Sequence, residues 1–186
     1  MQQWYAHGAG VATQPEHHDA FLYGAGDEKI GSIVAPTADA DTQRKRGRAL
    51  KAKFLKNTAG LSGLIKAIKA AAREKGWIKG IDGRRVSIRS SHAALNSLLQ
   101  NAGAVAMKLA ANILYARLIE EGYVWGVDFA FVANVHDEVQ LSVRHEIAEY
   151  IGKMSCESIT AAGEQLGFKC QLDGEYGIGT SWKDTH

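Results

Sequence analysis

Two adjacent carboxylates, Asp137 and Glu138, follow His136 between two stretches of alternating apolar residues. The alternation covers residues 129–135 before them and residues 139–143 after them, and it has the period of a β-strand. So short a separation predicts a tight β-hairpin with the acidic pair at or beside its tip. A rigid turn between buried strands would hold a carboxylate still, and carboxylate oxygens suit a hard cation such as Mg²⁺. A solvated turn is the alternative interpretation, because charged residues are common at hairpin tips.

Side-chain amides form a second set of regularly spaced polar groups. Asn96 and Gln100 stand four residues apart, so on a helix they share one face with His92 and Gly103. Such amides can contact a bound ligand, but they are also ordinary surface residues of helices.

Two other polar stretches could suggest a metal site or a phosphate-binding turn, but their patterns favour ordinary loop and helix structure. Residues 17–19 are His-His-Asp, but neighbouring ligand types without a second cluster are typical of an exposed loop. The glycine-rich residues 21–31 could form a phosphate-binding turn, yet no strand pattern precedes them and the stretch contains two acidic residues. We therefore expect a helix that ends at Tyr23, with Gly24 as its C-cap, and a second helix nearby.

Periodicity also predicts the elements that would position these groups. Residues 39–72 have a helical apolar stripe, with a break expected at residues 57–60. Residues 77–89 predict a second β-hairpin, because Asp82-Gly83 is a strong turn signal. A serine at position 90 or 91 can cap the next helix, which is long and largely apolar.

Basic residues gather on the face of residues 39–72 opposite the apolar stripe. They have no acidic counterparts in the pattern, so they could contact nucleic-acid phosphates, and a solvated helix face explains them equally well. The seven residues are Arg44, Lys45, Arg46, Arg48, Lys51, Lys53 and Lys56.

The pattern as a whole indicates an α+β fold. Residues 145–166 predict an amphipathic helix and residues 168–172 a final strand, which together with the first hairpin gives a small antiparallel sheet with helices on one face. A helical lobe precedes it. Residues 1–16 have no clear period and predict a flexible start.

Composition sets broad limits on the type of protein. The 186 residues carry a formal net charge of +2, which is too small by itself to indicate an anionic partner. Cys156 and Cys170 lack metal-ligand spacing, and we expect reduced thiols in a cytosolic setting. We find no secretion signal and no apolar run of membrane-spanning length, so no membrane partner is expected.

Val135-His136-Asp137-Glu138 resembles the last catalytic motif of the family A DNA polymerases. Three more blocks agree with that family in the same order: residues 21–31, 77–84 and 89–100. The likeness is greatest to replicative polymerases of short-tailed bacteriophages, and it runs from about Phe21 to His186.

The resemblance implies roles for particular residues. Asp137 would hold a catalytic metal ion, Glu138 would assist it, and His136 would lie near the primer end. Asn96, Gln100 and their neighbour His92 would lie beside the minor groove, where every Watson–Crick pair presents an acceptor. Tyr23 would lie near the templating base and the incoming nucleotide.

The chain also departs from the family pattern. Val11 and Pro15 stand where the family has the arginine and lysine that grip the triphosphate, and Asp19 stands where it has an aromatic residue. The second metal-binding aspartate belongs to a strand that would precede residue 1. We therefore interpret residues 1–16 as an unmatched segment, 17–89 as partial fingers and 90–186 as partial palm.

This organisation implies a C-terminal fragment of a DNA-directed DNA polymerase, which performs nucleotidyl transfer in DNA replication with two Mg²⁺ ions. The expected partners are primer-template DNA, deoxynucleoside triphosphates and an N-terminal polymerase part that supplies the second aspartate. The isolated chain is expected to be inactive, and the missing strand to leave an exposed sheet edge. The setting would be the cytoplasm, that of the host if a phage encodes the chain. The alternatives are an inactive truncated remnant and a module that only binds primer-template.

Overall fold

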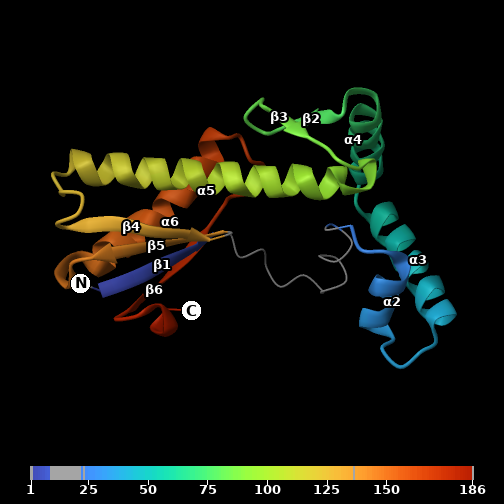
Figure 1. Cartoon of the computed structure of the whole chain (residues 1–186), viewed down its shortest axis with the longest axis horizontal. Coiled ribbons are helices and arrows are strands. Elements are labelled where there is room, and N and C mark those ends of the chain that lie inside the picture. The colour runs from blue at the N-terminus through green and yellow to red at the C-terminus, as the bar shows by residue number, and fades with distance from the viewer. Residues whose placement is uncertain (1, 9–21, 23, 136, 186) are drawn as a thin grey trace. The chain divides into compact units, whose positions relative to one another are not determined.

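The computed structural model describes residues 2–8, 22, 24–135 and 137–185 (Figure 1). The chain divides into two compact units. The sheet unit comprises Met1–Val11 and Ala102–His186, and the helical unit comprises Ala12–Asn101. The division falls within one long helix, α5 (Ala94–Glu120).

The sheet unit contains a four-stranded sheet in the order β4-β5-β1-β6. Every neighbouring pair of strands is antiparallel. The strands are β1 (Gln2–Gly8), β4 (Phe129–Val135), β5 (Glu138–Val143) and β6 (Gly174–Gly179). The expected hairpin at residues 129–143 is therefore confirmed, as is the α+β class.

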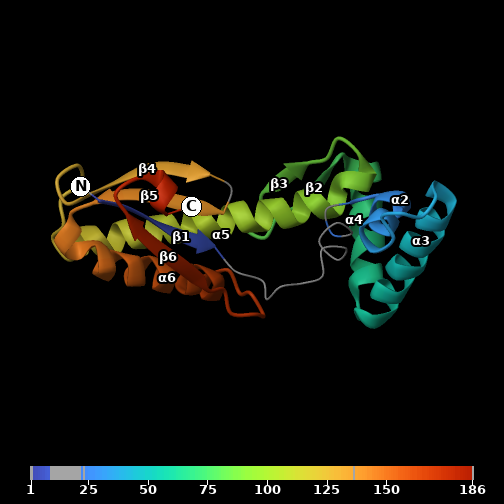
Figure 2. The same cartoon turned by 90° about the horizontal axis from the view of Figure 1, so that it is seen from below.

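The part of α5 that belongs to the sheet unit and a second helix, α6 (Ala148–Gln165), cover one face of this sheet (Figure 2). The alternating residues Val139, Leu141 and Val143 of β5 all point into the core that the helices share. The helices contribute buried residues that include Leu114, Leu118, Ile151, Met154 and Ile159. This arrangement confirms the helix expected near residues 145–166, which begins with a 3₁₀ turn at His145–Ile147.

Two expectations about the sheet unit are wrong. Residues 1–16 predicted a flexible start, but Gln2–Gly8 form β1, an inner strand that pairs with β5 on one side and β6 on the other. Unpaired N–H and C=O groups on a strand edge favour such pairing. The final strand is β6, not residues 168–172, because α6 binds this stretch instead: the Thr160 hydroxyl donates to the Leu172 carbonyl at 2.9 Å.

The helical unit contains α2 (Asp27–Val34), α3 (Ala40–Asn57) and α4 (Leu61–Lys75), followed by strands β2 (Trp77–Lys79) and β3 (Arg85–Ser87). The break between α3 and α4 is the one predicted, and Gly60 adopts a left-handed φ of 81° there. The predicted turn between β2 and β3 also forms, with Gly83 at φ 84°.

Helices α2 and α3 approach each other closely at two glycines. A Cβ atom on Gly31 would lie 1.8 Å from the carbonyl oxygen of Gln43, and one on Gly47 would lie 1.8 Å from the carbonyl oxygen of Asp27. No side chain fits at such distances, so the two helices pack backbone against backbone.

Helix α5 corrects the expectation about apolar length. Together with the preceding 3₁₀ turn, Ser91–Glu120 is long enough to cross a membrane, and an 18-residue window within it has a mean hydropathy of 1.3. Leu114 and Leu118 on this helix are buried in the core of the sheet unit, at 2% and 0% exposure. Core helices of soluble proteins pass the same test of length and composition, so one such helix is weak evidence of a membrane span.

Candidate active site

The tip of the β4–β5 hairpin holds the acidic pair that the sequence singled out. Val135 pairs with Glu138, so only positions 136 and 137 lie between the paired residues. Asp137 is exposed, whereas Glu138 is the first residue of β5 and is buried. His136 lies outside the described residues. The hairpin thus presents one carboxylate to solvent and withdraws the next into the structure.

Glu138 belongs to a buried polar face of β5. The face comprises Glu138, Gln140 and Ser142, which alternate with the apolar residues of the core. The Gln140 side-chain amide donates to Glu138 Oε1 at 2.8 Å. A buried carboxylate needs such donors, because an unpaired charge away from water is unfavourable. Gln140 therefore helps to fix the conformation of Glu138.

Sequence reasoning missed Gln140, although a signal was present. Positions 138, 140 and 142 are polar at strand spacing, a pattern that ordinarily marks a face turned to solvent. In the structure these residues are only 6%, 4% and 8% exposed. Polar residues buried on an inner strand indicate a site or interface more than a solvated surface.

Asp137 differs from its buried neighbour because it is exposed, and none of the ion pairs among the described residues involves its carboxylate. The same residues also contain no group of three or more His, Cys, Asp or Glu side chains that could hold a metal ion. The hairpin therefore offers carboxylate oxygens of the type Mg²⁺ prefers, but not a full set of ligands.

The predicted amide pair lies in the helical unit, at the start of α5. Asn96 and Gln100 are on this helix, as expected, but His92 is in a 3₁₀ turn at Ser91–Ala93, which the Ser90 hydroxyl caps at 3.3 Å. His92 and Gln100 are exposed. Asn96 Oδ1 is buried without a hydrogen-bond partner among the described residues, and the same is true of Asn101 Oδ1. Buried polar atoms are rarely unpaired, so each of these two oxygens could accept a hydrogen bond from a further group.

The chain before α2 is only partly described. Tyr23, the predicted nucleotide contact, lies outside the described residues, and so do residues 17–19. Gly24 adopts a left-handed φ of 86°, the conformation required of the predicted C-cap. The second helix expected nearby is α2, which begins at Asp27.

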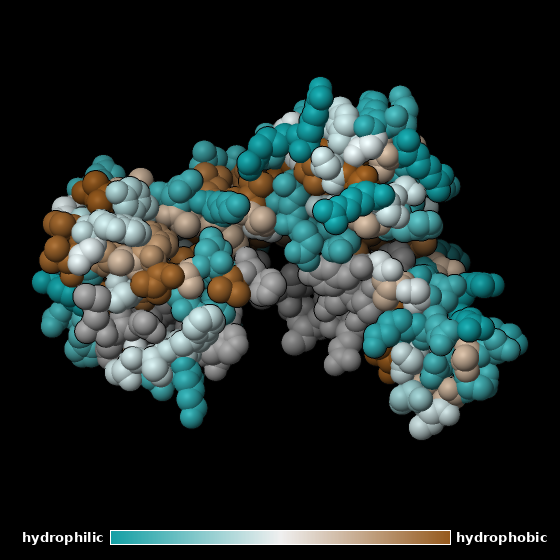
Figure 3. Space-filling model, in the orientation of Figure 1, coloured by the Kyte–Doolittle hydropathy of each residue, from teal (hydrophilic) through white to brown (hydrophobic). Residues whose placement is uncertain are grey.

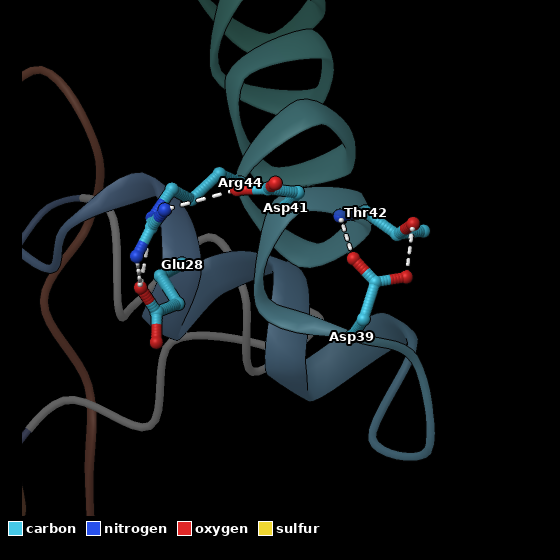
Figure 4. Close-up of polar contacts among 5 residues, drawn as sticks. All are labelled: Glu28, Asp39, Asp41, Thr42 and Arg44. Atoms are coloured by element: carbon cyan, nitrogen blue, oxygen red, sulfur yellow. Dashed lines mark hydrogen bonds and ion pairs between the residues drawn. The ribbon is translucent and has the colours of Figure 1, made fainter.

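The acidic residues at the start of α2 correct the interpretation of the basic helix face. Glu28 accepts from Arg44 at 2.9 Å, and Arg44 also contacts Asp41 at 3.1 Å (Figure 4). Asp27 contacts Lys51 at 2.9 Å and Arg48 at 3.4 Å. Three of the seven basic residues are thus paired with acids, which the sequence pattern alone did not reveal.

These contacts also set the charge state of Asp27. The hydrogen bond from Lys51, followed by the charge of Lys51 and the contact with Arg48, lowers the pKa of this carboxyl below its ordinary value, although partial burial opposes the shift. Asp27 therefore stays ionised while it holds α2 against α3.

An aromatic cluster lies on the sheet unit at the junction of α5 and β4. Trp125 stacks on Phe131 at 5.7 Å, and Tyr115 meets Trp125 edge to face at 5.7 Å. Tyr115 and Trp125 are 44% and 47% exposed. Apolar side chains gather at that end of the sheet unit in Figure 3, and the α5–β4 loop contributes Val124 and Val127.

Comparison with known proteins identifies the family. The profile of DNA polymerase family A matches residues 20–184. The chain belongs to this family. It is 42% identical to the DNA-directed DNA polymerase of Enterobacteria phage T3 and 41% identical to that of Escherichia phage T7, and each match covers 89% of this chain and 25% of the relative. It is also 26% identical to DNA polymerase I of Aquifex aeolicus, over 87% of this chain and 28% of that protein.

Membership of DNA polymerase family A confirms the resemblance seen in the sequence motifs. The matched residues include both hairpins, α2 to α6 and β6, but not β1. The chain spans about a quarter of the length of the phage relatives it matches. The family assignment therefore covers only a length equal to about a quarter of the phage relatives, and the activity of a whole polymerase is a matter for proposal.

Proposed function

We propose that this chain is the C-terminal palm and fingers portion of a DNA-directed DNA polymerase, with 17–89 as partial fingers and 90–186 as partial palm. It would take part in template-directed nucleotidyl transfer during DNA replication. The observation that carries the proposal is the β4–β5 hairpin, where a family A chain exposes Asp137 and buries Glu138 beside it.

Asp137 is the proposed metal ligand. It directly precedes Glu138, which pairs with Val135, so its exposed carboxylate would meet a cation at the end of the paired strands. Glu138 would act from behind it, through a hydrogen bond or a water molecule, with its orientation set by Gln140. His136, next to them in the sequence, would lie near the primer end.

The donor atoms fit Mg²⁺, whose preferred ligands are oxygens. In nucleotidyl transfer, a pair of such ions activates the primer hydroxyl and stabilises the charge on the triphosphate leaving group. The described residues contribute carboxylates at the hairpin tip but no complete ligand group. The second aspartate would therefore come from an N-terminal polymerase part, and this chain alone would be inactive.

The start of α5 is the proposed contact with primer-template DNA. Asn96 and Gln100 lie one helical turn apart, with the exposed His92 just before them. Amide donors at the minor groove test the position of acceptors that all correct pairs share, so they would check pair geometry without reading sequence. Tyr23 would contact the incoming deoxynucleoside triphosphate, and the reaction would take place in the cytoplasm of a host cell.

A complementation experiment tests the proposal. The T7 relative is expressed without the C-terminal quarter that this chain matches, and primer extension with Mg²⁺ and nucleotides is measured for each part and for the mixture. We expect extension only in the mixture. Extension by this chain alone would refute the missing-ligand argument, and an inactive mixture of folded parts would favour a remnant.

A further inference from the structure

The four-stranded sheet is continuous only because β1, which lies outside the family-matched residues, pairs with a matched strand on each side. Strands β5 and β6 both belong to the matched portion, yet they do not pair with each other, because β1 lies between them. Strand β1 pairs with β5 from Gln2 to His7 and with β6 from Gln3 to Gly8. Without β1, two strands of the family fold would face each other across a space one strand wide.

Strand β1 does not come from the family-matched sequence. The match begins at residue 20, twelve residues after β1 ends at Gly8. In this chain the strand between β5 and β6 therefore comes from outside residues 20–184. A segment without family likeness occupies this position.

The same segment lacks the chemistry that the position would require. Its end lies beside the acidic pair, because His7 is directly opposite Glu138. The residues of β1 are Gln-Gln-Trp-Tyr-Ala-His-Gly, and none of them is a carboxylate. The strand next to the proposed metal ligand thus completes the sheet without completing the ligand set.

We infer that the space between β5 and β6 is a strand-binding slot, which β1 occupies in the free chain and yields to an acidic strand from the rest of the polymerase. The inference rests on the proposed function for the identity of the incoming strand. It accounts for both the closed sheet and the incomplete ligand set. It also makes β1 a regulator, because the site is completed only when β1 leaves.

The exchange is feasible because both strands would form the same kind of backbone ladders. An incoming strand restores the hydrogen bonds that β1 gives up, as in other cases of strand addition. Strand β1 competes from within the chain, at an effective concentration in the millimolar range. A chain whose β1 cannot leave should therefore bind the partner at least about tenfold more weakly.

Ser142 permits a matched pair of disulfide locks. On one side it is directly opposite Gln3 of β1, and on the other it is opposite Ala130 of β4. Opposed residues on antiparallel strands lie about 4.5–5.5 Å apart at Cα, within the range of a disulfide. The first lock is Gln3→Cys with Ser142→Cys, and the control is Ala130→Cys with Ser142→Cys. Both carry Cys156→Ala and Cys170→Ser, so that the free thiols cannot interfere.

The partner is the T7 polymerase lacking its matched C-terminal quarter, and its affinity is measured by titration with each variant, oxidised and reduced. We expect oxidation to weaken binding at least tenfold in the β1 lock and to leave the β4 control unchanged. Hydrogen exchange on the reduced chain should show residues 2–8 losing protection on binding. Equal binding by the oxidised β1 lock, retained protection of residues 2–8, or no binding by the reduced chain would each overturn the inference.

Binding is measured without DNA or nucleotide, so the result is independent of catalysis. Strand exchange without primer extension would leave the slot intact and contradict the proposed function. Primer extension by the oxidised β1 lock would support the proposed function and contradict the strand-binding slot.

Discussion

The chain contains two Asp-Glu pairs, Asp27-Glu28 and Asp137-Glu138, with opposite surroundings. The first pair lies at the start of α2, where cationic side chains of α3 neutralise both carboxylates. In the second pair, Glu138 accepts from a neutral amide and Asp137 meets no cation among the described residues. The first pair is satisfied by ion pairs within the fold, whereas Asp137 of the second pair forms no ion pair with the residues that the structure describes.

The difference separates a structural carboxylate from a candidate catalytic one. A carboxylate paired with lysine and arginine stabilises the fold modestly, and its charge is already compensated, so it is a poor ligand for a metal ion. An exposed acid on a tight strand connection contributes little to stability and is available to a metal ion. Substitutions in the two pairs should therefore affect different properties, activity in one and stability in the other.

The largest effect is expected on synthesis by the mixture with the truncated T7 polymerase. Asp137→Asn keeps the size of the side chain but removes the charge that would hold the metal ion, and metal contacts contribute several kcal/mol to such reactions. We expect primer extension to fall at least about a thousandfold, which corresponds to about 4 kcal/mol. Asp27→Asn is the matched control and should stay within a few-fold of the wild type. Equal losses in the two variants would erase the distinction between the pairs.

The next effect concerns the packing that brings Asp27 to α3. Gly47→Ala would drive a methyl group into the Asp27 carbonyl, so the helices must separate, and we expect a loss of about 3 kcal/mol in the free energy of unfolding. Gly63→Ala in α4 is the control: a Cβ atom there meets nothing within 4 Å. Since alanine favours helix over glycine, this variant should gain up to about 1 kcal/mol. Urea denaturation measures both, and an unaffected Gly47→Ala chain would contradict the close packing.

A smaller effect separates the two members of the second pair. Glu138→Ala removes the acceptor of a buried amide, Gln140, and should lower the free energy of unfolding by about 1–3 kcal/mol. Asp137→Ala removes an exposed side chain and should change it by less than about 0.5 kcal/mol. Thermal melting of the two variants measures these changes. A larger loss of stability in Asp137→Ala than in Glu138→Ala would contradict the assignment of Glu138 as the structural member of the pair.

The smallest effect is expected at the first pair. Asp27→Asn should cost about 0.5–1 kcal/mol near neutral pH, as is usual for ion pairs near the surface. The pKa of Asp27 is lowered in the folded chain, so its contribution is present above the unfolded value of about 3.9 and is lost as pH falls through the folded value. The difference between wild type and variant should therefore shrink below about pH 4. A gap that widens in acid would show that the shift has the opposite sign.

The sequence predicted those elements whose formation depends on residues close together in the chain. The β4–β5 hairpin followed from two alternating stretches close together, the α3–α4 break from residues 57–60, and the β2–β3 turn from Asp82-Gly83. Each of these depends on residues close together in the chain, where spacing and turn propensity decide the outcome.

Features that depend on distant partners were not predictable in this way. Residues 2–8 have no alternation, and they became β1 only because strands far along the sequence offered open edges. The pairing of Asp27 with Lys51 required the close approach of α2 and α3 at Gly31 and Gly47. The roles of Asp137, Asn96 and Tyr23 came from resemblance to the family, and they stay predictions.

The central claim is that Asp137 holds a metal ion together with a ligand from outside this chain. Electron paramagnetic resonance of Mn²⁺, which replaces Mg²⁺ at oxygen-ligand sites, tests it directly on this chain, the truncated T7 polymerase, and the two mixed with primer-template and a non-hydrolysable nucleotide. We predict that the mixture binds Mn²⁺ at least tenfold more tightly than either part, and that Asp137→Asn removes the gain. Equally tight binding by this chain alone, or an unchanged gain in the variant, would contradict the claim.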